Sequence, residues 1–235
     1  MRRNLAISLA CAGIFAVVAV CLLHPGVRAE FRARMSRHSV ESRVREFGPT
    51  VEPVWRARCD AGGMAYPPAS VVLVALKRER ELRVYARGDG TSALLATYPF
   101  TAASGTIGPK LREGDRQVPE GVYAIESLNP NSRYHLSLRV GYPSDEDRRI
   151  AREEGRSQLG GDIMIHGGAG SVGCVAIGDD AIEEVFVLVA VVGTGNTEAL
   201  MCPSAAPEAA IDATTPTWVG ERYRLLADRL RELTP

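Results

Sequence analysis

The sequence predicts a mostly β domain of the α+β class. Between residues 70 and 140, short strand-like runs, the later ones alternating apolar and polar residues, are separated by Gly, Pro and charged turns. Residues 182–189 then carry one apolar stripe at helical spacing. A chain of 235 residues is long enough for one domain of catalytic size with additional segments, or for two small domains.

The overall charge is balanced. Lys and Arg number 28, as do Asp and Glu, so the formal net charge is zero. We expect no nucleic-acid partner, because no basic stripe interleaved with aromatic residues is present. A function must therefore come from a local site.

The N-terminus predicts a membrane-targeting segment over residues 1–29. Arg2 and Arg3 precede an uncharged apolar run over residues 5–23. A helix over this run spans roughly 28 Å, close to the thickness of a bilayer core. This length favours an uncleaved signal anchor, whereas small residues before a cut after Ala29 leave a cleaved signal peptide open.

Residues 30–67 are rich in arginine and are predicted to be a helical or loose juxtamembrane spacer. The positive-inside rule, applied to these arginines, would keep the following chain in the cytoplasm. This conflicts with the periplasmic location expected below from the chemistry.

Residues 68–202 are predicted to form the catalytic domain. A β-hairpin is expected around the charged turn 77–81, followed by a third strand in LLATYPFTAAS. The Gly- and Pro-rich residues 105–120 form a long loop, and loops of this length are often functional. Alternating runs at 122–125 and 134–140 predict two more strands, and residues 144–156 a charged helical piece.

The rest of the chain predicts a short strand, a helix and a last strand. GDIMIHGG is expected to be the short strand, and the helix follows over 178–193. Asp179 or Asp180 is expected to cap this helix, with Glu183 completing a capping box. NTEALMC is the last strand, and residues 203–235 read as a Pro/Ala-rich linker and an amphipathic C-terminal helix that packs on the domain surface.

His166 and Cys174 stand at the two ends of a glycine-rich loop. A thiol is a good nucleophile only as thiolate, and a hydrogen-bonded histidine lowers the thiol pKa by sharing the proton. Four glycines of the loop allow the positive φ angles that bring the two side chains together (Gly167, Gly168, Gly170, Gly173). Backbone N–H groups beside Cys174 then form an oxyanion hole.

Other readings of these residues have less support. Taken singly, a cysteine is more often a small buried apolar residue and a histidine a structural one. A metal site is not expected, because two ligands are too few and no CxxC or HExxH is present. Cys59 and Cys202 could pair in an oxidising compartment, which would leave Cys174 free, but the sequence leaves this open.

The segment IMIHGGAGSVGCVAI resembles the active-site segment of the L,D-transpeptidase (YkuD-type) catalytic domain. In that family, a histidine in an HG element precedes an S-x-G-C element that carries the nucleophile. SGTIGPKLREGDRQVPEGVYAI and NPNSRYHLSLRVGYPSDEDR are similar to upstream segments of the family, the latter to its YafK-like murein L,D-transpeptidase branch. The resemblance covers residues 68–202 and implies a β-sandwich catalytic domain with a helix after the cysteine loop.

The resemblance implies a role for each matching position. Cys174 resembles the nucleophile, and His166 resembles the group that accepts and donates its proton. Gly173 and the Cys174 N–H are similar to part of the oxyanion hole, and Gly167 is expected to support it. Ser171 matches the motif serine, which supports either the imidazole or the loop, although a plain turn residue stays open. Two further residues are expected either to line the substrate groove or to be solvated strand positions (Tyr134, Arg139).

The resemblance also implies the reaction. It is acyl transfer on peptidoglycan peptide stems through a thioester at meso-diaminopimelate, in the periplasm, without a cofactor. Val172 and Ala176 replace the histidine and arginine of the commoner motif S-H-G-C-[IV]-R, which fits the YafK-like branch. Members of that branch include hydrolases of diaminopimelate-linked bonds, for which a wall-linked lipoprotein would be a partner. A transferase and a hydrolase therefore both stay open. A catalytically silent wall-binding module is a further alternative.

Overall fold

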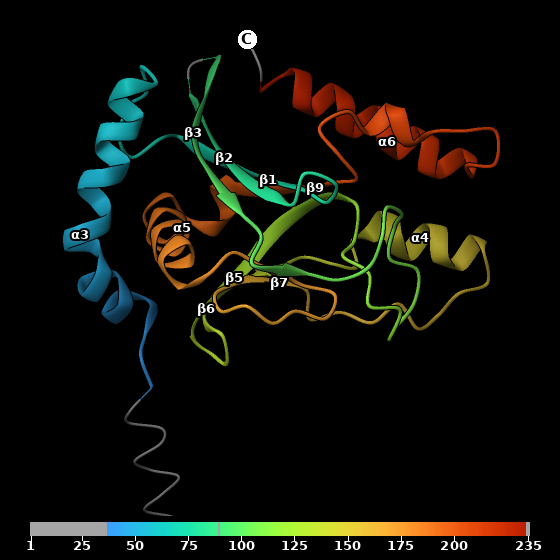
Figure 1. Ribbon diagram of the computed structural model, residues 1–235, viewed down its shortest axis with the longest axis horizontal. Helices are drawn as coiled ribbons and strands as arrows, with labels where there is room; N and C mark the ends of the chain where they lie inside the picture. The colour runs from blue at the N-terminus through green and yellow to red at the C-terminus, as the bar shows by residue number, and fades with distance from the viewer. Residues whose placement is uncertain (1–36, 89, 234–235) are drawn as a thin grey trace, which may run out of the picture. The chain divides into compact units, whose positions relative to one another are not determined.

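The computed structural model describes residues 37–88 and 90–233, and these contain a mixed α+β domain (Figure 1). The predicted apolar segment 5–23 and the cleavage position at Ala29 lie outside these residues. Within the described ranges, no helix has the length and apolar character needed to cross a bilayer.

The strands join in one hydrogen-bonded order, β3-β2-β1-β9-β5-β6-β7-β8-β4. Strand β5 is the longest and belongs to both halves of the sheet, since its first residues pair with β9 and its later residues pair with β6. The strands are β1 (Ser70–Leu76), β2 (Glu81–Gly88), β3 (Thr91–Pro99), β4 (Ala102–Ala103), β5 (Gly121–Ser132), β6 (His135–Val140), β7 (Met164–His166), β8 (Val175–Ala176) and β9 (Thr197–Cys202).

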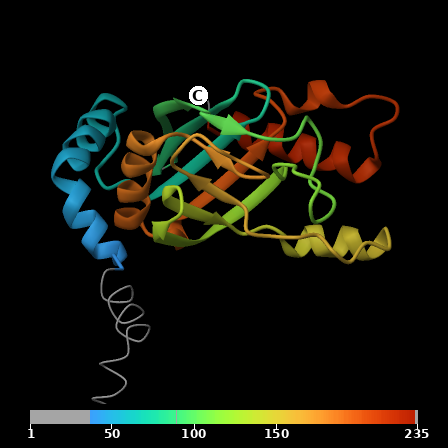
Figure 2. The same ribbon diagram turned by 60° about the horizontal axis from the view of Figure 1, so that its bottom comes forward.

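Helices cover both faces of the β1–β2–β9 half (Figures 1 and 2). Because β1 alternates sides and is buried on both, Leu73 packs into the core beneath two helices and Val74 into a second cluster beneath the C-terminal helix. Each such buried aliphatic side chain stabilises the fold by about 1.5–3 kcal/mol. The helices are α3 (Val40–Ala61) and α5 (Asp179–Val192) on the first side, α6 (Thr217–Arg231) on the second, and α4 (Asp145–Glu153) after β6.

The mixed α+β class and the helix that follows the cysteine loop are confirmed. The predicted hairpin is β1–β2, and the C-terminal helix packs against the sheet as α6. Part of the predicted spacer is ordered as α3, where Trp55 is fully buried and its indole N–H donates to the Glu184 carbonyl. The domain boundaries stay a prediction.

The expected capping box on α5 is wrong. Gly178 is the N-cap, and no side chain caps the helix. The Asp179 carboxylate instead accepts a hydrogen bond from the Gly168 N–H at 2.7 Å. A charged acceptor satisfies a loop N–H strongly, so Asp179 ties the glycine loop to the start of α5 instead of closing the helix end.

Cys59 and Cys202 are free thiols buried on opposite sides of the sheet. Cys59 belongs to α3 and faces the larger core cluster, and Cys202 belongs to β9 and lies in the cluster beneath α6. The pairing that the sequence left open is therefore not formed in this structure.

Candidate active site

The register of β7 and β8 places Cys174 and His166 on one face of the sheet. Ile165 pairs with Val175 and His166 with Ala176, so Cys174 is level with Met164. The Met164 N–H donates to Cys174 Sγ at 3.3 Å. Same-face positions of a strand repeat about every 7 Å along the backbone, so Cys174 is level with the position one such step before His166. The two predicted catalytic residues thus belong to neighbouring positions on one face of the sheet.

The His166 ring is held in one tautomer. His166 is only 2% exposed, and its Nδ1 lies 2.6 Å from the Gly167 carbonyl oxygen. A carbonyl oxygen only accepts, so Nδ1 carries the proton and Nε2 keeps a lone pair. Burial lowers the pKa of His166, although the Gly167 hydrogen bond opposes this. The neutral ring is therefore ready to accept a proton through Nε2.

The Cys174 thiol is neutral at rest. Burial raises the pKa of the Cys174 thiol, the nearby Asp162 charge adds to the increase, and the Met164 hydrogen bond and Lys110 oppose it. Within the described part of the chain, the thiol is hydrogen bonded to the Asp162 carbonyl oxygen at 3.5 Å and not to the imidazole. The lowered thiol pKa expected from the sequence is thus not found, because burial raises it and, among the described residues, no hydrogen bond to the imidazole opposes this.

Tyr134 covers the imidazole. The two rings stack with their centroids 4.5 Å apart and an angle of 25° between their planes. Tyr134 is 42% exposed, so one face shields His166 from solvent while the rest stays accessible. This placement suits both the predicted groove position and a role in fixing the ring.

Two glycines of the loop are required for different reasons. Gly173 has φ +81°, a left-handed conformation that a side chain would strain. Gly167 has an ordinary φ, but a Cβ there would lie 2.5 Å from Asp179 Oδ1 and 2.8 Å from the Tyr134 carbonyl oxygen. Of the four loop glycines, only Gly168 and Gly173 adopt the positive φ that the sequence predicted for the group.

The two predicted oxyanion donors differ in availability. The Gly173 N–H donates to the Ser104 hydroxyl oxygen at 2.6 Å, so it is occupied in the free protein. The Cys174 N–H, by contrast, has no protein partner among the described residues. The Ser171 hydroxyl donates to the Cys174 carbonyl oxygen at 2.6 Å, which braces the loop and not the imidazole.

Arg139 lies on the same face as the nucleophile. It pairs with Met164 across β6 and β7, and paired residues of antiparallel strands share a face. Its Nε donates to Glu126 at 3.0 Å and its Nη1 to Asp162 at 2.6 Å. Hydrogen bonds to these carboxylates raise the pKa of Arg139, Asp162 contributing most.

Sequence reasoning missed four polar residues that shape this site. Ser104 lies 69 residues before its partner Gly173, and no local pattern connects them. Asp179 was assigned to helix capping, although its nearness to the glycine loop was a signal for the contact that it makes. The other two surround Arg139 (Glu126, Asp162).

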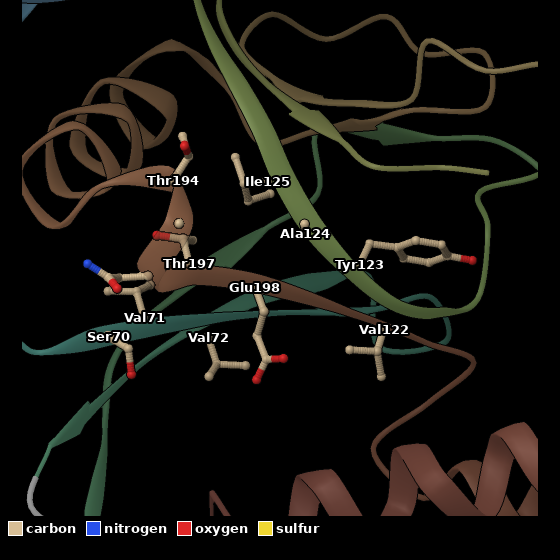
Figure 3. Close-up of a pocket in the computed structure, with 12 residues that line it drawn as sticks. Ser70, Val71, Val72, Val122, Tyr123, Ala124, Ile125, Thr194, Thr197 and Glu198 are labelled. Carbon is tan, nitrogen blue, oxygen red and sulfur yellow. The ribbon is translucent and has the colours of Figure 1, made fainter. Parts of the chain in front are cut away.

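A separate hollow of about 520 Å³ opens beside η1 (Thr194–Asn196) and is shown in Figure 3. Its one carboxylate, Glu198, is already ion paired with Arg87 and Arg229. The lining residues come from β1, β5, η1 and β9 and include none of the predicted site residues: 70–72, 122–125 and 194–198. In the described ranges, no group of three or more His, Cys, Asp or Glu side chains is arranged to hold a metal ion.

Comparison with known proteins gives a family assignment. Residues 69–201 match YkuD, the L,D-transpeptidase catalytic domain. The proteins named "Putative L,D-transpeptidase YafK" in Escherichia coli strains K12 and O157:H7 are each 36% identical over 121 residues, which is 51% of this chain and 47% of the relative. The match therefore spans about half the length of these curated relatives.

Solved structures also resemble this chain. The helical cell shape determining protein Pgp2 from Campylobacter jejuni is 23% identical with a TM-score of 0.48, covering 68% of this chain and 54% of that one. Bd1075 of Bdellovibrio bacteriovorus is 19% identical with a TM-score of 0.44, covering 70% and 61%. Because the family match covers more than half of the residues, this chain belongs to the L,D-transpeptidase catalytic domain (YkuD) family.

Proposed function

We propose that this protein is a cysteine-dependent acyltransferase that acts on the peptide stems of peptidoglycan. Family membership supports a peptidoglycan-modifying activity. The observation that supports the proposal most is the β7–β8 register, which, continued by one residue, gives Cys174 and His166 positions on the same face. The hydrogen bond from His166 Nδ1 to the Gly167 carbonyl leaves Nε2 as the base.

In the proposed reaction, Cys174 Sγ attacks the carbonyl carbon on the L-centre of meso-diaminopimelate. His166 Nε2 takes the thiol proton, so the neutral pair becomes charged only when substrate is bound. The Cys174 N–H donates to the developing oxyanion. When the tetrahedral intermediate collapses, His166 gives the proton to the departing amine and a thioester remains. An amine of a neighbouring stem, or water, then attacks the thioester and frees the thiol.

The acyl acceptor decides whether the enzyme is a transferase or a hydrolase: an amine of a neighbouring stem for the first, water for the second. Val172 and Ala176 stand where the commoner family motif has histidine and arginine. These departures favour, as the second candidate, a hydrolase of diaminopimelate-linked bonds, including the bond between murein and a wall-linked lipoprotein.

The proposed substrate lies outside the cytoplasmic membrane. We therefore propose a periplasmic location for residues 30–235, tethered to the inner membrane by residues 5–23 or released by cleavage near Ala29. Fusion of alkaline phosphatase after residue 235 tests this, because that reporter is active only outside the cytoplasm. An inactive but expressed fusion contradicts the location.

Carbapenem labelling tests the nucleophile. We expect one covalent adduct on Cys174, located by peptide mapping, that Cys174→Ala abolishes and Cys59→Ala retains. Absence of an adduct on the folded wild-type protein would favour the silent wall-binding module.

A product assay distinguishes the transferase from the hydrolase. The protein is incubated with tetrapeptide muropeptides and, separately, with lipoprotein-linked murein. Cross-linked dimers support the transferase, and release of lipoprotein alone supports the hydrolase.

A further inference from the structure

The charged cluster of Arg139, Glu126 and Asp162 adjoins the nucleophile through the backbone of Asp162. The Cys174 thiol is hydrogen bonded to the Asp162 carbonyl oxygen, and the Asp162 side chain holds Arg139 at 2.6 Å. Arg139 itself is level with Met164, the residue whose N–H binds Cys174 Sγ. Arg139 therefore lies on the face of the sheet that carries Cys174, and the Asp162 backbone joins the cluster to the thiol.

A contribution to folding stability does not explain why these three charged side chains lie together. Its side chains are 39%, 51% and 81% exposed for Arg139, Glu126 and Asp162, respectively. Exposed ion pairs contribute about 0–1 kcal/mol to folding. Moreover, Asp162 has φ +55°, a left-handed conformation that costs a non-glycine residue free energy. Strain of this kind persists at binding sites, where the surrounding structure maintains it.

Arg139 keeps donors for a ligand. Its Nε binds Glu126 and its Nη1 binds Asp162, whereas its Nη2 has no protein partner among the described residues. A ligand carboxylate can therefore be accepted without breaking either ion pair. The two acidic side chains leave the cluster with one excess negative charge, so an isolated carboxylate would be repelled. A zwitterion that carries an ammonium group beside its carboxylate matches this arrangement.

From this arrangement we infer that Arg139, Glu126 and Asp162 form a subsite for a free amino-acid head group on the substrate side chain. The inference rests on the proposed function, and it names the D-centre of meso-diaminopimelate, which carries both an amine and a carboxylate at the end of a short methylene chain. Arg139 binds the carboxylate, and Glu126 and Asp162 bind the ammonium. The subsite selects diaminopimelate stems over stems that lack the carboxylate.

The test compares kcat/KM of the full-length protein on three tetrapeptide stems. The first has free meso-diaminopimelate, the second has the D-centre carboxyl converted to a carboxamide, and the third has L-lysine at this position. We expect the wild-type protein to prefer the free carboxylate about 10- to 100-fold, as for a lost charge-assisted hydrogen bond. Arg139→Gln removes this preference, and Arg139→Lys keeps part of it.

Arg149→Gln is the matched control, because Arg149 is also an exposed arginine in an ion pair, with Glu153 on α4. It should keep the full preference. Asp162→Asn tests the other half of the subsite independently, since asparagine tolerates the left-handed backbone. It should reduce the preference for a free D-centre amine over an acetylated one. Circular dichroism verifies that each variant is folded.

The outcomes separate the two proposals. A wild-type protein that turns over all three stems equally overturns the subsite and leaves the proposed function standing. A folded Arg139→Gln that keeps the wild-type preference overturns it as well. A wild-type protein that acts on none of the stems, and forms no carbapenem adduct, overturns the proposed function and the subsite with it.

Discussion

Ser104 and Gly173 are joined by a hydrogen bond in which the Gly173 N–H donates to the Ser104 hydroxyl oxygen at 2.6 Å. The same hydroxyl donates to the Arg116 carbonyl oxygen at 2.8 Å. One side chain therefore connects the cysteine loop with the long loop over residues 104–120.

Replacement of Ser104 by alanine should destabilise the cysteine loop. Gly173 is buried, and a buried N–H without a partner costs about 1–3 kcal/mol. We expect Ser104→Ala to lower the free energy of unfolding by about 1–2 kcal/mol in urea titrations and to slow carbapenem acylation. Ser104→Thr keeps a hydroxyl and should restore much of both, whereas the exposed Ser157→Ala should change neither. Unchanged stability and acylation in Ser104→Ala would show that the tether is dispensable.

The stacked ring of Tyr134 should matter for catalysis more than for folding. Aromatic stacking is worth about 0.5–1.5 kcal/mol. Tyr134→Ala removes the cover of His166 and should lower kcat for stem turnover about threefold to tenfold. It should also raise the pKa of His166 toward its usual value, which NMR of the imidazole protons measures. Tyr134→Phe keeps the ring and should behave as the wild-type protein. A Phe variant as impaired as the Ala variant would assign the effect to the hydroxyl instead.

The sequence predicted the local elements well and the contacts between distant segments poorly. A continuous apolar run predicted β1, which is buried on both faces, and alternation of apolar and polar residues predicted β2 and β6. The spacing of α5 predicted its buried face through Val185 and Phe186. These patterns are local, so one sequence is enough to detect them.

The electrostatics of the site could not be predicted in this way. A histidine beside a thiol lowers the thiol pKa only if the two groups are hydrogen bonded and solvated enough to be charged. In this fold, burial keeps both His166 and Cys174 neutral. Tyr134 contributes to the burial of His166 by stacking on its ring. Because Tyr134 belongs to the turn between β5 and β6, it reaches His166 only through tertiary packing.

The neutral His166 predicts a specific pH dependence of stability. Its pKa is lowered in the folded protein, whereas the unfolded chain has a value near 6.5. Below about pH 6.5 the unfolded state therefore binds more protons, so stability that is present above this pH is lost as the pH falls toward the folded pKa. Urea titrations at pH 8 and pH 5 should show that the free energy of unfolding falls more between these pH values for the wild-type protein than for His166→Gln. Equal losses would mean that the folded imidazole titrates normally.

A buried ion pair connects the long loop to the rest of the domain. Lys77 Nζ and Glu120 Oε1 are 2.9 Å apart, and their side chains are 6% and 0% exposed. The Tyr223 hydroxyl of α6 donates to Glu120 Oε2 at 2.5 Å, and the Gly108 N–H donates to Oε1 at 2.9 Å. Burial lowers the pKa of Lys77, which Glu120 opposes. Glu120 thus joins the turn after β1, α6 and the loop.

Removal of the Glu120 charge alone should therefore be costly. Breaking a buried pair leaves an uncompensated charge and costs about 3–5 kcal/mol, whereas replacing both partners is much better tolerated. We expect Glu120→Gln to lower the free energy of unfolding by about that amount, and the double variant Lys77→Met with Glu120→Gln to recover more than half of the loss. Arg149→Gln, which breaks an exposed pair, should change stability by less than about 0.5 kcal/mol. If Glu120→Gln costs less than about 1 kcal/mol, water reaches the pair and Glu120 does not anchor the loop.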